Sequence, residues 1–322
     1  MTKPLTQPFP RPIIGWSVLA LLVFASLVSF VDRQIVAIVV EPMKHDLDLS
    51  DSEIGWLYGI FAVFYALAAL PIAWLADNRN RTVIISIGIG FWSAMTAACG
   101  LAQSFWQVLL ARMGVGVGEA TLTPATNSLL GDYFPRERLP LAMSIYQLGP
   151  ILGSGIAFVI GGVVLNLVQD LGPMTIPGIG TLHPWQQTFV YLGAPGLLLA
   201  LAFLLLPEPV RRVAPSGTRM AFDEVLLFYR QNTRTLTYHH LGFLFLNLMG
   251  YAFVFWTVSF FVRVHHLEAA DASQTFGWIF AVFGAMGPLV IAWLGRQLEI
   301  RGRADANITA GMIGGALAGG FL

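Results

Sequence analysis

The chain alternates between long apolar stretches and short polar connections. Each stretch has about the 20 residues that an α-helix needs to cross a bilayer core of roughly 30 Å. The pattern predicts eight complete membrane-spanning helices and part of a ninth, which covers 307–322. The eight complete spans are Ile14–Val40, Ile54–Ala76, Thr82–Leu101, Phe105–Leu130, Leu139–Leu167, Thr188–Leu206, Leu241–Val264 and Phe276–Leu294.

The length of these stretches excludes a membrane barrel, whose strands are short and alternate in hydrophobicity. The sequence therefore predicts an all-α membrane protein. Composition agrees, because 56% of the residues are hydrophobic and only 11% are charged, whereas soluble domains are about 25% charged. This balance excludes a soluble enzyme, a nucleic-acid-binding protein with a basic surface and a disordered chain. The single cysteine, Cys99, excludes a disulfide framework and a thiolate metal site.

Basic residues are distributed unequally between the two sides of the predicted helices. Fourteen lie on the side of the amino terminus, and only Lys44 and Arg263 lie on the other. Basic loops stay in the cytoplasm, so we expect a multi-pass protein of the cell membrane (the inner membrane in a bacterium) with a cytoplasmic amino terminus. The fourteen are Lys3, Arg11, Arg79, Arg81, Arg136, Arg138, Arg211, Arg212, Arg219, Arg230, Arg234, Arg296, Arg301 and Arg303.

Two connections are long enough to have structure of their own. In 207–238, Phe222, Val225, Leu226 and Tyr229 have helical spacing, which favours a helix lying on the inner headgroups over a regulatory contact. On the opposite side, the connection 169–187 predicts a hairpin or an Ω-loop, because it contains the turn signals Gly172-Pro173, Pro177-Gly178 and His183-Pro184.

The second and eighth spans are related by an internal repeat. The segments 60–75 and 279–294 align without gaps and share 11 of 16 residues. Helix n therefore corresponds to helix n+6 in the same orientation, as in a parallel duplication of a six-helix unit. We expect a six-helix bundle over 1–206, a cytoplasmic linker with an interfacial helix over 207–240, and a partial second bundle over 241–322.

Two six-helix units need three helices beyond the ninth. We therefore expect the chain to be truncated at its carboxyl end and to lack roughly a quarter of the whole protein.

Several short segments resemble the major facilitator superfamily. The loop 73–81 is similar to the family's G-x-L-a-D-r-x-g-R motif and keeps Leu75, Asp77 and Arg81. The segment 112–118 in the fourth span is similar to the R-x-x-x-G-x-G run of the family. The fifth span carries a G-P-x-x-G motif at Gly149, Pro150 and Gly153, and the sixth carries Gly193-Ala194-Pro195-Gly196. Ala73, Asn78 and Asn80 depart from the first motif.

Within that superfamily, Asp32-Arg33 and Gly118-Glu119-Ala120 resemble the Spinster group. The resemblance implies the major facilitator fold and transport of a lysolipid, sphingosine-1-phosphate or a similar amphipathic molecule. It also implies a gating role for the loop that contains Asp77, Arg79 and Arg81. A plain basic loop is the alternative for these three residues.

Four ionisable residues lie deep inside the predicted spans: Asp32, Arg33, Arg112 and Glu119. Each would cost about 2.5–3.5 kcal/mol at the bilayer centre, so we expect them to face the interior of the bundle. The estimated depths allow an Asp32–Arg112 pair. We interpret Asp32 and Glu119 as proton-sensitive groups of a charge network; a network that only fixes helix packing is the alternative.

Other residues are weaker candidates. Gly149, Pro150 and Gly153 predict a hinge or a close-packing site in the fifth helix. Tyr58, Tyr65, Tyr146 and Gln147 are candidates for lining a substrate cavity, although aromatic residues in membrane helices also face lipid or the protein core. The six histidines form no metal-ligand set with cysteine or carboxylate residues, so neither a metal nor a cofactor is expected.

The sequence favours a secondary active transporter that works by alternating access and is coupled to protons. Its expected substrate is a small organic or lipid-like molecule, and the protein is expected to act as a monomer without a nucleic-acid partner. A multidrug or organic-anion efflux carrier and a non-transporting membrane receptor are alternatives. No catalytic constellation or phosphate-binding loop is recognisable, so an enzyme is not expected.

Overall fold

The structure is a computed structural model in which residues 9–178, 180–212, 222–303 and 305–320 are described. Lys3 and Arg219, which were counted for the orientation, lie outside these residues. The helices are α1 (Pro12–Ile38), α2 (Val40–Leu47), α3 (Asp51–Asn78), α4 (Arg81–Gly100), α5 (Phe105–Glu119), α6 (Leu122–Tyr133), α7 (Leu139–Leu171), α8 (Pro184–Leu204), α9 (Phe222–Gln231), α10 (Thr233–His265), α11 (Ala269–Ile300) and α12 (Ala306–Gly320).

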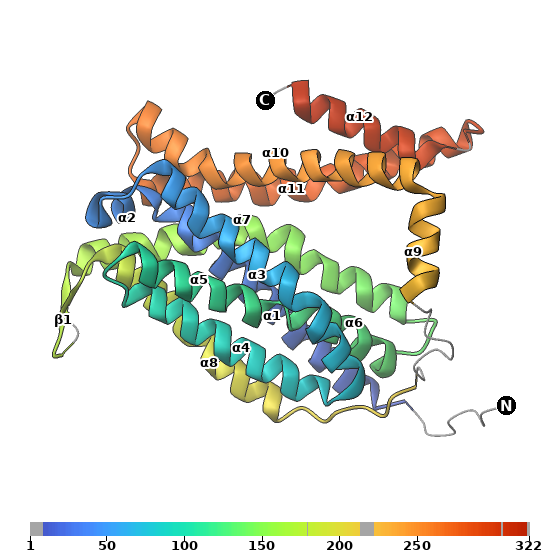
Figure 1. Cartoon of the computed structure of the whole chain (residues 1–322), viewed down its shortest axis with the longest axis horizontal. Coiled ribbons are helices and arrows are strands. Elements are labelled where there is room, and N and C mark those ends of the chain that lie inside the picture. Colours follow the sequence, from blue (N-terminus) through green and yellow to red (C-terminus); the bar gives the residue numbers. More distant parts are fainter. Residues whose placement is uncertain (1–8, 179, 213–221, 304, 321–322) are drawn as a thin grey trace.

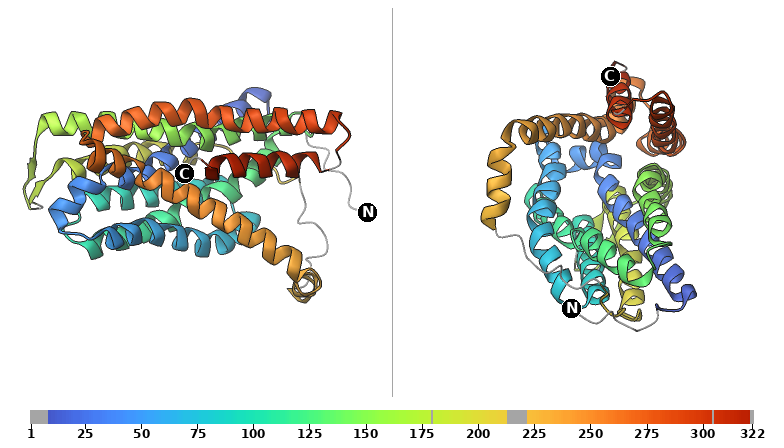
Figure 2. Two further views of the ribbon diagram at one scale, coloured as in Figure 1. Left: turned by 90° about the horizontal axis from the view of Figure 1, so that it is seen from above. Right: turned by 90° about the vertical axis from the view of Figure 1, so that its right-hand side faces the viewer.

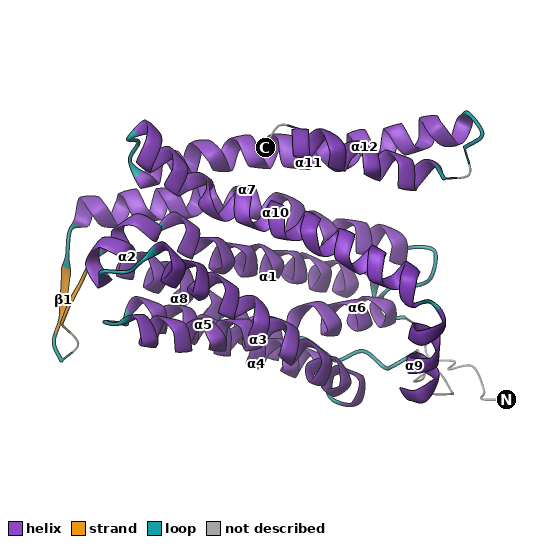
Figure 3. Ribbon diagram, turned by 45° about the horizontal axis from the view of Figure 1, so that its top comes forward, coloured by secondary structure: helices purple, strands orange, loops and turns teal. Residues whose placement is uncertain are grey.

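The long helices lie side by side and run back and forth between two ends of the molecule (Figure 1). One end holds the start of α1 and the loops that carry most of the arginines, and we call it the arginine-rich end. The other end holds a two-stranded sheet, β1 (Met174–Ile176) and β2 (Gly180–Leu182), and we call it the hairpin end. Apart from this hairpin, the described regular structure is helical (Figure 3). The all-α prediction is therefore confirmed.

The helices form two groups (Figure 2). Helices α1 to α8 form the first bundle, and α10 to α12 lie along one side of it, with α11 packed against α7. Helices α3 and α11, which contain the two copies of the sequence repeat, run in the same direction from the hairpin end (Figure 1). The shared direction is the one expected for a parallel duplication.

Within the described residues, seven helices are long and apolar enough to cross a membrane. They correspond to seven of the eight predicted complete spans. Many of their large apolar side chains are exposed; Leu70, for example, is 80% exposed and Leu198 is 72% exposed. An apolar surface of this kind suits a protein whose solvent is the bilayer hydrocarbon.

The predicted fourth span is the exception, because two shorter helices replace it. α5 ends at Glu119 and α6 begins at Leu122, with a turn between them. Pro124 explains the break, since proline has no N–H to donate to the carbonyl of Ala120 and its ring crowds that carbonyl. The hydroxyl of Thr121 donates to the Gly118 carbonyl at 2.8 Å and satisfies part of the exposed helix end.

The two structured connections have the predicted character but different bounds. β1 and β2 form an antiparallel hairpin, and the side-chain amide of Gln187 holds its base by donating to the carbonyls of Gly172 (2.8 Å) and Leu182 (3.1 Å). α9 occupies the predicted linker. The following helix, α10, begins at Thr233, so the expected boundary at residue 240 falls inside a continuous helix.

Glycines let the two groups of helices approach closely. A side chain at Gly155 of α7 would collide with the backbone of Ala281 in α11, at 2.5 Å from its Cα. A side chain at Gly277 of α11 would collide with the carbonyl of Gly155 at 2.8 Å. Small residues at such contacts are typical of membrane helix packing.

Candidate functional site

An ion pair between α1 and the end of α5 lies at the centre of the first bundle. Arg33 donates through Nε to Oε2 of Glu119 at 2.7 Å, and the Ser29 hydroxyl donates to the same oxygen at 2.7 Å. Glu119 is only 1% exposed. Because a glutamate at a helix carboxyl terminus opposes the helix dipole, these two hydrogen bonds offset an otherwise unfavourable position.

Glycines bring the neighbouring helices close to Glu119. A side chain at Gly118 would collide with Trp92 of α4, and one at Gly116 would collide with the Phe61 carbonyl of α3 at 2.5 Å. The end of α5 can therefore sit deep between α3 and α4. The glycine run that resembles the family motif thus has a direct packing role next to the buried carboxylate.

Three aromatic rings surround the guanidinium of Arg33. The centroids of Phe30, Phe61 and Tyr65 lie 5.1, 5.3 and 4.9 Å from its Cζ. Such contacts stabilise a cation that has lost part of its hydration. The Arg33 side chain keeps 18% of its surface exposed.

Asp32 and Arg112 are also buried, but their side chains do not form the ion pair that the estimated depths allow. Arg112 donates through Nη1 to the backbone carbonyl of Asp32 at 3.0 Å, and its face lies over the Phe61 ring at 4.9 Å. Trp92 and Thr96 lie beside the Asp32 carboxyl without reaching hydrogen-bonding geometry. Within the described part of the chain, neither carboxyl oxygen of Asp32 has a hydrogen-bond partner.

The four predicted intramembrane charges thus come together inside the bundle. Asp32 and Arg112 are fully buried and Glu119 almost so, whereas Arg33 reaches a cavity. Sequence reasoning missed Ser29, although it lies one helical turn before Arg33 on the same face of α1.

That cavity lies between the two groups of helices and has a volume of about 720 Å³. Its walls come from α1 and α7 on one side and from α10 and α11 on the other. Arg33 is the charged residue among those that line it, and most of the others are apolar or aromatic. The lining residues are Phe30, Arg33, Gln34, Ser154, Phe243, Leu246, Asn247, Met249, Gly250, Tyr251, Phe253, Val254 and Phe280.

The four residues proposed from the sequence to line a cavity are not among those lining residues. Tyr58 packs behind the wall against Phe255, with ring centroids 4.3 Å apart. Tyr65 contacts Arg33, Tyr146 is 4% exposed in the core, and Gln147 is exposed. Sequence reasoning missed the α10 wall, because apolar residues in a hydrophobic span carry no signal for one face.

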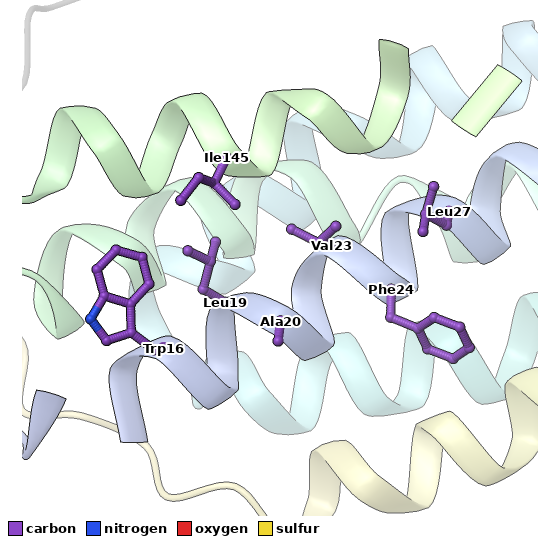
Figure 4. Close-up of a pocket in the computed structure, with 7 residues that line it drawn as sticks. All are labelled: Trp16, Leu19, Ala20, Val23, Phe24, Leu27 and Ile145. Carbon is purple, nitrogen blue, oxygen red and sulfur yellow. The ribbon is translucent and has the colours of Figure 1, made fainter. Parts of the chain in front are cut away.

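A second depression of about 350 Å³ lies on the surface of α1 beside α7 (Figure 4). All of its lining side chains are apolar or aromatic, and no charged group reaches it. The indole N–H of Trp16 is the one polar side-chain group among these residues. Its lining residues are Trp16, Leu19, Ala20, Val23, Phe24, Leu27 and Ile145.

At the arginine-rich end, the residues proposed for a gating loop have unequal roles. Arg81 is fully buried and donates to Asp132 at 2.5 Å and to Glu208 at 2.7 Å. Asp77 and Arg79 are exposed. The sequence indicated Arg81 through the family motif, but its two carboxylate partners were missed because they lie far away along the chain.

The segment after α8 closes around this loop. Arg211 donates to the carbonyls of Ala76 (2.7 Å), Asp77 and Arg79, and Tyr133 donates to the Pro207 carbonyl. The segment 207–212 thus holds the loop between α3 and α4 through hydrogen bonds to the loop's backbone carbonyls.

The proposed hinge in α7 is a close contact with α1. A side chain at Gly149 would lie 2.9 Å from the Ser26 hydroxyl, and one at Gly153 would lie 3.2 Å from Cβ of Phe30. α7 continues as one helix through Pro150. The geometry therefore shows the packing role and leaves hinge motion as a prediction.

At the hairpin end, ion pairs connect the second group of helices to the first. Arg263 near the end of α10 pairs with Glu41 of α2 at 2.8 Å and with Asp51 of α3 at 2.7 Å. Lys44 also pairs with Asp51 at 2.6 Å. Among the residues that the structure describes, no group of three His, Cys, Asp or Glu could hold a metal ion.

Known proteins share both the sequence pattern and the fold of this chain. The sequence matches the Major Facilitator Superfamily over residues 22–322. It is 27% identical to an MFS-type efflux pump of Mycolicibacterium smegmatis, covering 90% of this chain and 64% of the pump. It is 26% identical to the sphingosine-1-phosphate transporter SPNS2 of Danio rerio, covering 95% of this chain and 61% of the transporter.

The structure resembles a bacterial homologue of the human lysosomal transporter Spinster, solved in an inward-facing and unoccupied conformation. The TM-score is 0.76 with 32% sequence identity, over 91% of this chain and 64% of the homologue. The same homologue in an occupied, inward-facing conformation gives a TM-score of 0.77. The chain thus spans less than two thirds of the length of these relatives.

The names of these relatives are those of transporters, which agrees with the expectation that the protein is not an enzyme. The Spinster resemblance seen in the sequence is likewise confirmed by relatives that carry this name. With a family match over nearly its whole length and a fold shared with a solved homologue, the chain belongs to the Major Facilitator Superfamily and is Spinster-like within it.

Proposed function

We propose that the protein is a secondary active transporter that carries an anionic, amphipathic substrate and is coupled to protons through Glu119. The observation that carries this proposal is the Arg33–Glu119 pair, because Arg33 also borders the cavity between the two groups of helices. A largely apolar cavity with one cation in its wall suits a molecule with a hydrocarbon tail and a negative headgroup.

The coupling follows from charge. With both acids ionised, the two arginines and two acids of the network sum to zero. Protonation of Glu119 removes its charge and leaves a net positive charge at Arg33, which an anion entering the cavity can neutralise. Because an unpaired charge at membrane depth is costly, proton uptake and anion binding favour each other. Asp32, whose carboxyl oxygens lack partners among the described residues, is proposed as a second proton site.

Alternating access would occur by rocking of the two groups of helices around this cavity. The proposal includes a cytoplasmic amino terminus, so that the arginine-rich end faces the cytoplasm. It also includes a gating role for the loop of Asp77, Arg79 and Arg81 and hinge motion at Gly149, Pro150 and Gly153. The hydrogen bonds between the segment 207–212 and that loop support the gating role, since they have to break for the loop to move.

A test uses the protein reconstituted in proteoliposomes with an imposed pH gradient. We expect uptake of a lysophospholipid with an anionic headgroup to follow the gradient, and Glu119→Gln to abolish gradient-driven uptake while retaining counterflow of the same lipid. Normal gradient-driven uptake by Glu119→Gln would exclude Glu119 as the proton carrier. Glu137→Gln, which changes an exposed carboxylate outside both the charge network and the proposed gating loop, is the control for the loss of one negative charge.

A multidrug carrier is the second candidate function, because an efflux pump is among the similar proteins. Counterflow distinguishes the two. A lipid carrier exchanges lysophospholipid and ignores a lipophilic cationic drug, whereas a drug carrier exchanges the drug.

A further inference from the structure

Gln34 is a buried polar residue of the cavity wall that the charge network does not use. It follows Arg33 on α1, is 4% exposed, and lines the same cavity. Its Oε1 atom is buried and accepts no hydrogen bond from any described residue. A buried acceptor without a partner costs about 1–3 kcal/mol. Because Gln34 lines the cavity, a rotation of its side-chain amide that presents Oε1 to a hydrogen-bond donor on a ligand is favourable.

Two of the other uncharged polar residues of the wall, Asn247 and Ser154, also offer acceptor oxygens. Asn247 of α10 uses its amide N–H to donate to the Phe243 carbonyl at 2.7 Å, and Ser154 of α7 uses its hydroxyl to donate to the Pro150 carbonyl at 3.3 Å. Both keep an oxygen that can accept a hydrogen bond. The wall thus combines one cation with acceptor oxygens on α1, α7 and α10.

We infer that Gln34 is a specificity-determining residue that accepts a hydrogen bond from a hydroxyl or ammonium group near the anionic group of the substrate. This inference rests on the proposed function and narrows its substrate class. Arg33 and Gln34 are consecutive on α1, so a substrate that places its anion on Arg33 brings the neighbouring part of its headgroup to Gln34. An amphiphile with a bare anionic headgroup leaves Oε1 unpaired and binds more weakly.

The test measures binding, without transport, to two probes that differ in one donor. The probes are a 1-acyl-glycerol-3-phosphate with its free 2-hydroxyl and the 2-deoxy analogue with the same acyl chain. We expect the protein in lipid nanodiscs to bind the hydroxyl probe about tenfold more tightly by calorimetric titration, which is the size of one hydrogen bond to a buried acceptor.

Replacement of the acceptor separates its chemistry from its size. We expect Gln34→Leu to weaken binding of the hydroxyl probe to the level of the deoxy probe and to leave the deoxy probe unchanged. Gln169→Leu, at an exposed glutamine near the hairpin end of α7, is the matched control and should preserve the difference.

Each of the remaining outcomes contradicts either the role of Gln34 or the proposed function. Equal affinity of the two probes for the unmodified protein overturns the role of Gln34 and leaves anion binding intact. An equal loss for both probes in Gln34→Leu means that Gln34 acts through packing, which also overturns it. Binding of neither probe overturns the proposed lipid function together with this inference. Should Gln34→Leu fail to fold, the comparison of the two probes on the unmodified protein decides alone.

Discussion

The buried charges of this protein differ in how their neighbours satisfy them. Glu119 receives two hydrogen bonds at one oxygen, whereas Asp32 receives none from the described residues. Arg81 at the arginine-rich end is the most completely paired, with two carboxylates and the Ser128 carbonyl as acceptors. The complete pairing of Arg81 holds its loop in place in this structure, and the incompletely paired residues suit a site that changes its protonation or its ligand.

Arg81 therefore provides a prediction at the scale of one residue. We expect Arg81→Lys to lower the free energy of unfolding by about 2 kcal/mol, because an ammonium group cannot replace the forked contacts of the guanidinium. Arg79→Lys, two residues earlier and exposed, should change it by less than about 0.5 kcal/mol. Thermal unfolding of both variants in the same detergent measures the difference, and equal midpoints would show that the buried fork contributes nothing.

At the scale of elements, glycine contacts control how closely helices approach. The contact between α7 and α11 matters most, because it joins the two groups of helices. We expect Gly277→Ala to destabilise the protein by about 1–3 kcal/mol, since the new Cβ would lie 2.7 Å from the Val159 backbone nitrogen. Gly287→Ala on the same helix, where nothing lies within 4 Å, is the control. Thermal unfolding of the two alanine variants checks this, and an unaffected Gly277→Ala would mean that the helices move apart without cost.

The elements also show what a sequence can and cannot predict. Spans with continuous hydrophobicity, such as the second and third, were predicted within a few residues, because one property of the side chains determines them. The break before Leu122 was missed, although Pro124 carried the signal, because hydrophobicity continues through it. The partners of Arg81 were missed for a different reason. Only the folded chain brings Asp132 and Glu208 together, and neither has a local pattern that marks it.

At the scale of the whole molecule, the two groups of helices are held together by ion pairs at the hairpin end. Arg263 bridges to α2 and α3 there, and its guanidinium also lies 5.6 Å from the Trp256 ring. Because Arg263 joins the two groups of helices there, its ion pairs have to break for the hairpin end to open.

Removal of these ion pairs should shift the conformational equilibrium. We expect Arg263→Ala to increase the population in which the hairpin end is open by about threefold to tenfold, because partly exposed pairs contribute up to about 1 kcal/mol and several act together here. Spin labels at His45 of α2 and His266 after α10, both exposed, report the opening as a longer distance in pulsed electron resonance. The native Cys99 is buried and does not compete for the label.

Arg303→Ala is the control for Arg263→Ala, and the salt concentration provides an independent test of the ion pairs. Arg303 pairs with Asp305 in the loop between α11 and α12, so Arg303→Ala removes an arginine without touching the contact between the two groups of helices. It should leave the distance distribution unchanged. Because exposed ion pairs are screened, raising the salt concentration to 1 M should shift the unmodified protein in the same direction as Arg263→Ala and have little further effect on that variant. A distribution that responds to neither change would show that apolar packing alone, through α7 and α11, keeps the hairpin end closed.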